Sequence, residues 1–250
     1  MKKKLTLKLR HKIPLTIVFV STLVELIYAV LRVVLTEDTV DSFDILCIAS
    51  CTGMLLLMWI PLFTDRMFNR VIPPTMYTSF VVFCFCGLIL GDVKNLYAHF
   101  THWDSMLHFI SGMLLAVLGF VLVNTLNDSK RAGISMSPFF VAAVAFCFVM
   151  TIQSLWEIGE FLCDEWFGTN SQTFLETTTG SLVTDEDVPL VGHEALRDTM
   201  SDFMLDGLGG LIVSTIGYFD LKRGKKSFAS EKLIPHDEQE ELKENKDGKS

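Results

Sequence analysis

Six long apolar segments alternate with short polar ones along this chain of 250 residues. Each is close to the length of about 20 residues that a helix needs to cross the hydrocarbon layer of a bilayer. The predicted spans are residues 13–35, 43–63, 76–96, 103–126, 138–163 and 199–219. The pattern therefore predicts an all-α integral membrane protein, a bundle of six transmembrane helices over residues 13–219.

Basic residues are concentrated in alternate connections, which sets an orientation by the positive-inside rule. They occur in residues 1–12, which carry six, after the second and fourth spans, and after the sixth: Arg66, Arg70, Lys130, Arg131, Lys222, Arg223, Lys225 and Lys226. The connections 36–42 and 98–102 have none, and the loop 164–198 has only Arg197. We therefore predict that both termini are cytoplasmic in a cell (plasma or inner) membrane and that the loop 164–198 is extracytoplasmic.

The ends of the chain fit this scheme. Residues 1–12 are a basic start, but the first apolar segment is too long for a cleaved signal peptide and lacks a small-residue cleavage site, so a retained anchor is predicted. Residues 220–250 are polar with mixed charge, which predicts a disordered cytoplasmic tail.

The overall composition agrees with a membrane protein. Half of the residues are hydrophobic and 20 are phenylalanine. The net charge of −8 reflects acidic residues gathered in the loop 164–198 and in the tail, so it indicates nothing about nucleic acid. Membrane lipids are the expected partners, no nucleic-acid partner is expected, and a protein partner stays open.

Three aspartates open the sixth span at intervals of four residues, at Asp198, Asp202 and Asp206. On an α-helix this spacing puts all three on one face. Carboxylates within a bilayer are rare and usually face protein, water or ions. The alternative is that the span begins near Gly207, with Asp198 as an exposed helix N-cap.

Spans four and five carry matching polar faces. Asp104 and His108 lie at i and i+4 near the start of span four, and Glu157 and Glu160 lie near the end of span five. With the predicted orientation, all of these groups and the three aspartates fall at the same outer depth. Asp104 alone could be an N-cap, and His108 could be a hydrogen-bonded structural residue.

So many carboxylates in a low-dielectric bundle need compensation. Bound cations, protonation, or ion pairs with Lys94, Arg32 and Arg197 could supply it. Oxygen-rich sites with one histidine favour Mg²⁺ or Mn²⁺, then Fe²⁺ or Zn²⁺. The candidate metal ligands are Asp104, His108, Glu157, Glu160, Asp198, Asp202 and Asp206, and the candidate catalytic residues are Glu157 and Glu160.

The stretch from His102 to Phe219 resembles the YjdF-like family of uncharacterised bacterial multi-pass inner-membrane proteins and, more distantly, VanZ-like proteins. The segments that resemble this family are residues 103–112, 156–161, 168–172, 198–202 and 206–209. Between Gln172 and Asp198 this chain is longer than the family pattern. The resemblance implies a membrane location and no established reaction.

Three kinds of function remain open from the sequence. The first is a metal-dependent intramembrane enzyme acting on lipid or polyprenyl-phosphate substrates at the outer face. The second is a proton- or cation-coupled transporter, since intramembrane carboxylates suit a relay. The third is a structural or immunity-type membrane protein whose polar core only assembles the bundle. The sequence does not decide whether the protein is an enzyme.

Overall fold

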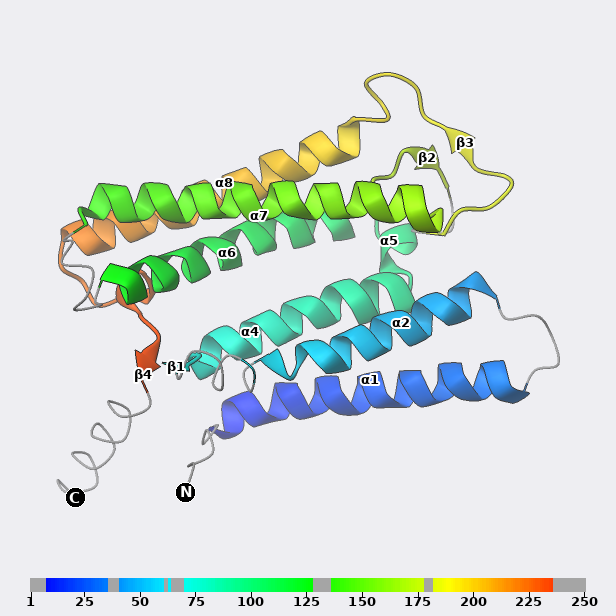
Figure 1. Cartoon of the computed structure of the whole chain (residues 1–250), viewed down its shortest axis with the longest axis horizontal. Helices are drawn as coiled ribbons and strands as arrows, with labels where there is room; N and C mark the ends of the chain where they lie inside the picture. The colour runs from blue at the N-terminus through cyan, green and yellow to red at the C-terminus, as the bar shows by residue number, and fades with distance from the viewer. Residues whose placement is uncertain are drawn as a thin grey trace. The chain divides into compact units, whose positions relative to one another are not determined.

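The structure of the chain is a computed structural model that describes residues 8–35, 41–60, 63, 70–127, 136–177 and 182–235 (Figure 1). It is mainly helical, with four very short strands, in element order α1, α2, β1, α4, η1, α5, α6, α7, β2, β3, α8, η2 and β4. The chain divides into two compact units, residues 1–89 with 233–250 and residues 90–232.

The first unit contains α1 (Leu9–Leu35), α2 (Ser42–Leu57) and α4 (Pro74–Phe85), which run side by side (Figure 1). Polar contacts join these helices, among them one of 3.1 Å between His11 Nδ1 of α1 and Thr78 Oγ1 of α4. Arg32 Nε of α1 lies 2.9 Å from Asp44 Oδ1 of α2, and Tyr77 Oη of α4 donates to the Met58 carbonyl at 2.8 Å. Strands β1 (Arg70–Val71) and β4 (Ile234–Pro235) pair antiparallel.

Five helical segments in the described part of the chain are long and apolar enough to cross a membrane: Leu9–Leu35, Pro74–Val93, Trp103–Asn127, Pro138–Phe167 and Arg197–Lys222. The predicted second span differs. Helix α2 ends at Leu57 and has 16 residues, which is short for a crossing of about 30 Å at 1.5 Å per residue. A sixth span is therefore not established. The basic positions Arg66, Lys130 and Arg131 lie outside the described residues.

The third predicted span changes geometry partway. Helix α4 continues as the π-helix η1 (Cys86–Val93), which connects the two units along the chain. Within η1, Gly91 faces the ring of Tyr97, where a Cβ would overlap the aromatic carbons. The short helix α5 (Leu96–His99) follows, with Asn95 in the left-handed region at φ 56°. A hydropathy profile does not detect this change of helix type, because the whole segment is apolar.

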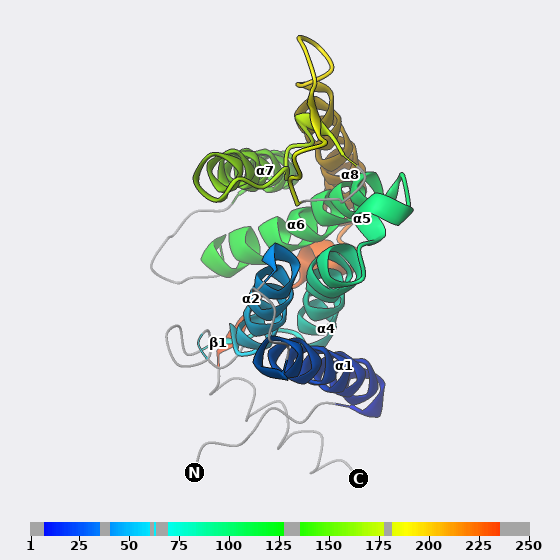
Figure 2. The ribbon, with the colours of Figure 1, turned by 90° about the vertical axis from the view of Figure 1, so that its right-hand side faces the viewer.

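The second unit is a three-helix bundle of α6 (Trp103–Asn127), α7 (Pro138–Phe167) and α8 (Arg197–Lys222). Figure 2 looks along the helices and shows α6 beside both α7 and α8. Helix α7 has a favourable N-terminus. Its N-cap Ser137 accepts a hydrogen bond from the Phe140 backbone N–H at 3.3 Å, and Pro138 occupies the first turn.

Glycines set how closely these helices approach. Gly112 of α6 lies against the backbone carbonyl of Asp206 in α8, and Gly209 of α8 lies against the backbone carbonyl of Phe109 in α6. A Cβ at either position would overlap that oxygen. Small residues at such points allow membrane helices to pack backbone to backbone. This crossing of α6 and α8 is therefore fixed by main-chain contact.

On the side of the crossing toward the C-terminal ends of α6 and α8, apolar side chains pack together in the bundle. The buried groups are Ala116, Val149 and Val213, with a neighbouring cluster of Phe120, Val123, Val141, Ala142, Ala145 and Ala229. Gly217 faces the Phe120 ring and Gly210 faces Val149, so small residues again admit the larger partner.

The start of the predicted disordered tail packs on this core. The 3₁₀ helix η2 (Phe228–Ser230) places the Phe228 ring 5.9 Å from that of Phe120, edge to face. Asn124 Nδ2 of α6 donates to the Ala229 carbonyl at 2.6 Å. The order here comes from one aromatic side chain and one half-buried amide, Asn124, which the polar average of residues 220–250 conceals. Residues 236–250 lie outside the described residues.

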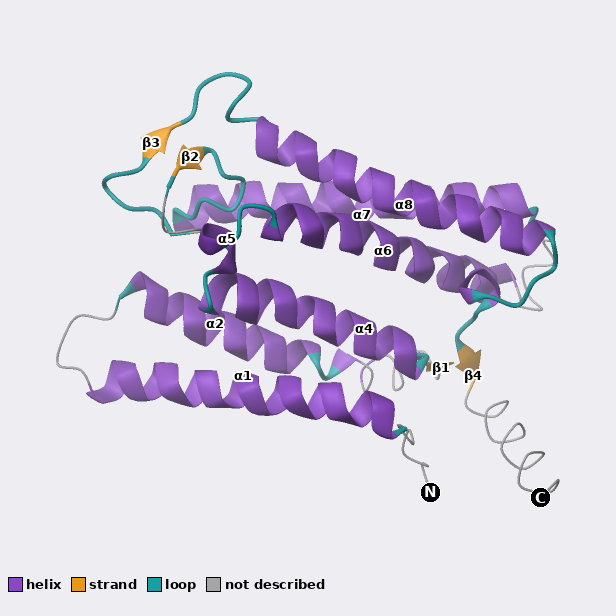
Figure 3. Ribbon diagram, turned by 180° about the vertical axis from the view of Figure 1, so that it is seen from behind, coloured by secondary structure: helices purple, strands orange, loops and turns teal. Residues whose placement is uncertain are grey.

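The loop between α7 and α8 is tied down at its start. Helix α7 ends at Gly168, whose φ of +65° is the left-handed conformation of a helix C-cap. Asp164 accepts hydrogen bonds from the backbone N–H groups of Ser171 at 2.6 Å and Gln172 at 2.9 Å, and from Thr169 Oγ1 at 2.7 Å. Strands β2 (Leu175–Glu176) and β3 (Val188–Pro189) form a small antiparallel pair farther along (Figure 3).

Replacing Gly112 with alanine should force α6 and α8 apart, because the new methyl group meets main-chain atoms that cannot rotate away. We expect a loss of about 1–3 kcal/mol, the usual cost of overpacking, seen as a lower Tm in detergent. Gly159→Ala in α7 is the matched control, since a Cβ there meets nothing within 4 Å. An unchanged Tm for Gly112→Ala would contradict the close crossing.

Replacing Asp164 with asparagine should loosen the first turn of the loop. The variant keeps one acceptor oxygen but loses the charge and the second acceptor, and hydrogen bonds to a charged group are worth about 1.5–3 kcal/mol. Hydrogen exchange of the Ser171 and Gln172 amides should therefore speed up by about tenfold or more. Glu165→Gln, an exposed neighbour, should leave these amides as protected as in the parent protein.

Candidate metal centre

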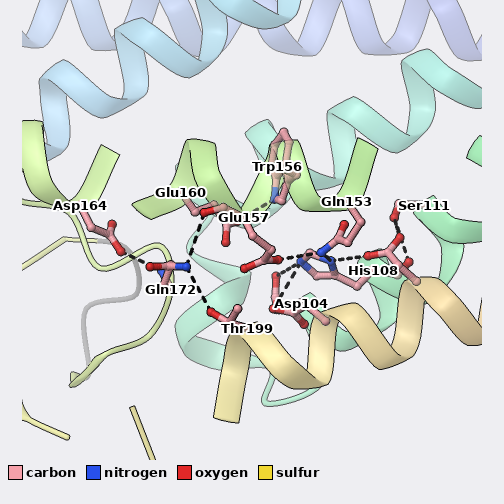
Figure 4. Close-up of polar contacts among 12 residues, drawn as sticks. Asp104, His108, Ser111, Gln153, Trp156, Glu157, Glu160, Asp164, Gln172 and Thr199 are labelled. Carbon is pink, nitrogen blue, oxygen red and sulfur yellow. Dashed lines mark hydrogen bonds and ion pairs between the residues drawn. The ribbon is translucent and has the colours of Figure 1, made fainter. Parts of the chain in front are cut away.

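The candidate site lies in the second unit, at the end of the bundle nearest the loop. Helices α6 and α8 contribute their first halves and α7 contributes its second half, so the polar faces of the three helices meet in the half of the bundle nearest the loop. Figure 4 shows Asp104, Gln153 and Glu157 directed toward His108 from these helices. The three polar faces are predicted by residue spacing, but the contacts between them come from the packing.

His108 is held by Asp206 from the opposite helix. The ring Nδ1 lies 2.7 Å from Asp206 Oδ2, and Ser111 Oγ donates to the other carboxylate oxygen. Asp206 is fully buried, with an exposed fraction of 0%. Because an ionised carboxylate only accepts hydrogen bonds, we assign a proton to Nδ1, which leaves Nε2 of a neutral ring with a free lone pair.

The free side of the imidazole faces two further carboxylates. Nε2 lies 3.6 Å from Asp104 Oδ1 and 3.7 Å from Asp202 Oδ2. Both distances exceed that of a direct hydrogen bond. One ligand atom from each of Asp104, His108 and Asp202 lies within 4.8 Å of the others. We call these three residues the Asp-His-Asp group.

The geometry of the Asp-His-Asp group suits a small divalent cation. Metal–ligand bonds of about 2.0–2.2 Å put neighbouring ligand atoms about 3.4 Å apart in a tetrahedral site and about 3.0 Å apart in the octahedral site that Mg²⁺ prefers. The separations of 3.6 and 3.7 Å from His108 Nε2 are wider than both, so the ligands would move closer together around a bound cation. A histidine that binds metal through one nitrogen usually donates its other N–H to a carboxylate, which orients the ring. Asp206 stands in that position on His108.

Charge balance also leaves room for a cation. In the described part of the chain, every ion pair of Asp104, Asp202 and Asp206 has His108 as its partner. Arg32, which was considered as a counter-ion, pairs instead with Asp44 and Asp41 in the first unit. Arg197 is exposed at the start of α8. One imidazole thus faces three carboxylates.

Helix α7 adds a second polar pair beside the histidine. Gln153 Nε2 lies 3.3 Å from His108 Nδ1 and donates to Glu157 Oε1 at 2.7 Å. Both side chains are buried, with exposed fractions of 2% for Gln153 and 4% for Glu157. The second oxygen, Glu157 Oε2, is buried without a hydrogen-bond partner in the described structure. A polar atom in that state is costly and indicates a missing partner.

The other predicted site residues lie around this centre. Glu160 accepts a hydrogen bond from Trp156 Nε1 at 2.7 Å, one turn farther along α7. Asp198 is half-buried in the first turn of α8 and is not part of the Asp-His-Asp group. Of the seven candidate ligands, the packing therefore assembles three into one group, adds Asp206 behind the histidine, and leaves Glu157, Glu160 and Asp198 outside it.

The start of α8 excludes one part of the alternative for its aspartates, the N-cap. The helix begins at Arg197, and its N-cap is Leu196, so Asp198 is not an N-cap and the helix does not begin near Gly207. Asp206 lies nine residues after Arg197, about 14 Å along the helix axis. The ladder is therefore inside the helix, and its deeper members are buried against α6.

Gln172 of the loop contacts both α7 and α8 beside the polar group. Its Nε2 donates to Thr199 Oγ1 of α8 at 3.2 Å and lies 3.5 Å from the Glu157 carbonyl of α7. The Asp164 hydrogen bonds hold this residue in place from its backbone side. Gln172 thus connects the ends of α7 and α8 next to the polar group.

Sequence reasoning gave no role to Gln153. It stands four residues before Glu157, and an amide at this spacing within an apolar run is the signal that could have linked it to that carboxylate. The direct bond between His108 and Asp206 was also missed, because the two residues are 98 positions apart and nothing in the local spacing pairs them.

Comparison with known proteins gives a family and no activity. No curated protein and no solved structure matches the chain. The family model described as "Predicted membrane protein (DUF2238)" matches residues 17–223, most of the chain and all of the helices of the site. The site and its helices thus fall within a family of helical, multi-pass membrane proteins, and this chain belongs to the DUF2238 family.

Proposed function

We propose that this protein is a membrane enzyme that binds one divalent cation at Asp104, His108 and Asp202 and uses it to act on membrane lipids. The observation that carries the proposal is the position of His108. Asp206 holds its Nδ1, while its Nε2 points at the carboxylates of Asp104 and Asp202, which lie 3.6 and 3.7 Å away, too far for direct hydrogen bonds. The oxygen-rich ligand set favours Mg²⁺ or Mn²⁺, with Fe²⁺ or Zn²⁺ next.

An incomplete ligand set supports catalysis over simple structural binding. Three protein ligands leave at least one coordination position open, which is the usual arrangement of catalytic metal sites. A cation there would polarise a substrate oxygen or lower the pKa of a bound water. The buried Glu157 stands close by with an oxygen that lacks a partner. A site built only to hold helices together would gain stability by satisfying that oxygen internally.

The interior below the site favours an enzyme over a transporter that uses this bundle. A relay needs a chain of polar groups across the membrane. Past the α6–α8 crossing, apolar clusters that include Ala116, Val149 and Val213 fill the bundle. The buried polar residues of α8 on that side are Ser214 and Asp220, and neither contacts the site. Within the described three-helix unit, the polar contacts of the site are gathered at one end.

We further propose that α2 completes a sixth span and that both termini are cytoplasmic, in a cell membrane. The distribution of basic residues supports this orientation, because alternate connections are rich and poor in lysine and arginine. The site would then open to the extracytoplasmic face, beneath the loop 164–198.

Metal analysis of the purified protein tests the cation. We expect about one divalent ion per chain in the parent protein, since three ligands converge on one point. Asp104→Asn and Asp202→Asn keep the side-chain shape but remove a charged ligand, so both should lose the metal while eluting as the folded protein. Adding the metal at 100 times its Kd should stabilise the parent by about 2.7 kcal/mol.

Glu165→Gln, an exposed change on α7, is the control and should retain the metal. Parent protein without metal, with a Tm that Mg²⁺, Mn²⁺, Fe²⁺ and Zn²⁺ leave unchanged, would contradict the proposal. The aspartates would then be compensated by a protonated His108 alone, and His108→Ala would only lower stability.

Fusions at the two ends test the topology. With six spans, green fluorescent protein should fluoresce at both termini, because it folds only on the cytoplasmic side. Alkaline phosphatase inserted at Gly192 in the loop should be active. Termini on opposite sides of the membrane would instead show five spans and a helix α2 that does not cross.

A further inference from the structure

Glu157 is the buried acid of the site that the cation proposal leaves unused. One of its oxygens accepts from Gln153 at 2.7 Å, and the other has no partner in the described structure. The side chain is 4% exposed, so bulk water does not satisfy that oxygen. Burying a carboxylate without a hydrogen bond costs free energy, and nothing in the packing of the three helices requires it.

The orientation of Glu157 indicates what its free oxygen is for. Gln153 lies between it and His108: the amide nitrogen is 3.3 Å from the protonated Nδ1 of the ring and donates to the carboxylate at 2.7 Å. Figure 4 shows the Glu157 carboxylate between His108 and Gln172. The carboxylate therefore lies beside the histidine of the proposed cation site.

We propose that Glu157 is the general base of a hydrolase whose substrate is a membrane lipid with an uncharged ester or amide carbonyl. This rests on the proposed cation site. Glu157 accepts a proton from a water held at the site, and the water oxygen bonds to the carbonyl carbon. The bond from that carbon to the alcohol or amine then breaks, and the leaving group takes the proton back from Glu157. The net change is one water consumed and one fatty acid released.

The charges around the site favour a neutral reacting group over a phosphate. Two aspartates and a neutral imidazole bring a divalent cation to about zero net charge. Beyond these ligands, the ionisable groups with hydrogen bonds in the site are the acids Asp206, Glu157 and Glu160, while Arg197 is exposed at the start of α8. A phosphate needs basic side chains or donors, as arginine–phosphate pairs illustrate. The described carboxylates that form the group pair with no lysine or arginine.

The surface of α7 beside Glu157 suits a substrate with an acyl chain. Leu155, Trp156, Ile158 and Phe161 are each more than half exposed, and they surround the positions of Glu157 and Glu160 along the helix. Large exposed apolar side chains on a membrane helix face lipid. A lipid carbonyl lies at the boundary between the acyl chains and the head groups, and tryptophan is enriched at the same depth. A lipid could thus reach the site along the membrane plane.

One mixed vesicle assay separates the bond types. The parent protein is reconstituted, with its metal, in vesicles of phosphatidylethanolamine, phosphatidylglycerol and ceramide, and the products are identified by mass spectrometry. These lipids offer carboxylic esters, an amide and phosphodiesters to the same site. We expect free fatty acid and a lyso-lipid or sphingoid base. Release of a phosphorylated head group would overturn the choice of a carbonyl.

The variants test Glu157 itself. Glu157→Gln keeps the shape and the contact with Gln153, so it should retain the metal of the parent and lose about 10²–10⁴-fold in kcat. Glu165→Gln should retain both. Loss of metal from Glu157→Gln would make Glu157 a ligand, and an unchanged kcat would remove its role as base. Each result overturns the inference.

The cation site and the hydrolase would be contradicted by different results. A parent protein that binds metal but releases no product from any of the three lipids overturns the hydrolase and leaves the cation site standing. A parent protein that binds no metal overturns the cation site, and with it the basis of the hydrolase.

Discussion

The bond between His108 and Asp206 is the interaction on which the rest of the site depends. It joins α6 to α8 deep in the bundle, at 2.7 Å and out of contact with water. An unpaired carboxylate at that depth would be strongly unfavourable, so the pair is both a requirement of burial and the reason the imidazole has a fixed orientation. The direction of Nε2, and through it the Asp-His-Asp group, follows from this one contact.

Close contact between the main chains of α6 and α8 explains how His108 and Asp206 come within bonding distance. Gly112 and Gly209 let α6 and α8 touch at the level of Asp206 and Phe109. With larger residues there, the helices would stand farther apart and the carboxylate would not meet the ring. Beyond the crossing, apolar clusters around Val149 and Phe120 fill the bundle, and no carboxylate that pairs with His108 lies among them. Shape and chemistry are set by the same pair of glycines.

Much of this arrangement could be predicted from spacing. Intervals of four residues place Asp104 with His108, and Asp202 with Asp206, each on one face, and hydropathy locates five helices that are long enough to span a membrane. Contacts between helices could not be predicted in this way. The partner of His108 depends on helix rotation and depth, and the role of Gln153 depends on α7 lying against α6. The length of α2 and the π-helix after α4 depend on backbone geometry that composition does not encode.

The aspartates of α8 have a consequence for how the protein enters the membrane. Helix α8 is the least apolar of the five helices that could span, because Asp198, Asp202 and Asp206 all lie in its first half. A single aspartate near the centre of a span costs about 2.5–3.5 kcal/mol on the scale set by translocon insertion. Helices α6 and α7 leave the ribosome first and bring His108 and Gln153 into the bilayer. When α8 inserts, the polar side chains that pair with its aspartates are therefore already in the bilayer. Insertion of α8 and assembly of the site then occur in the same step.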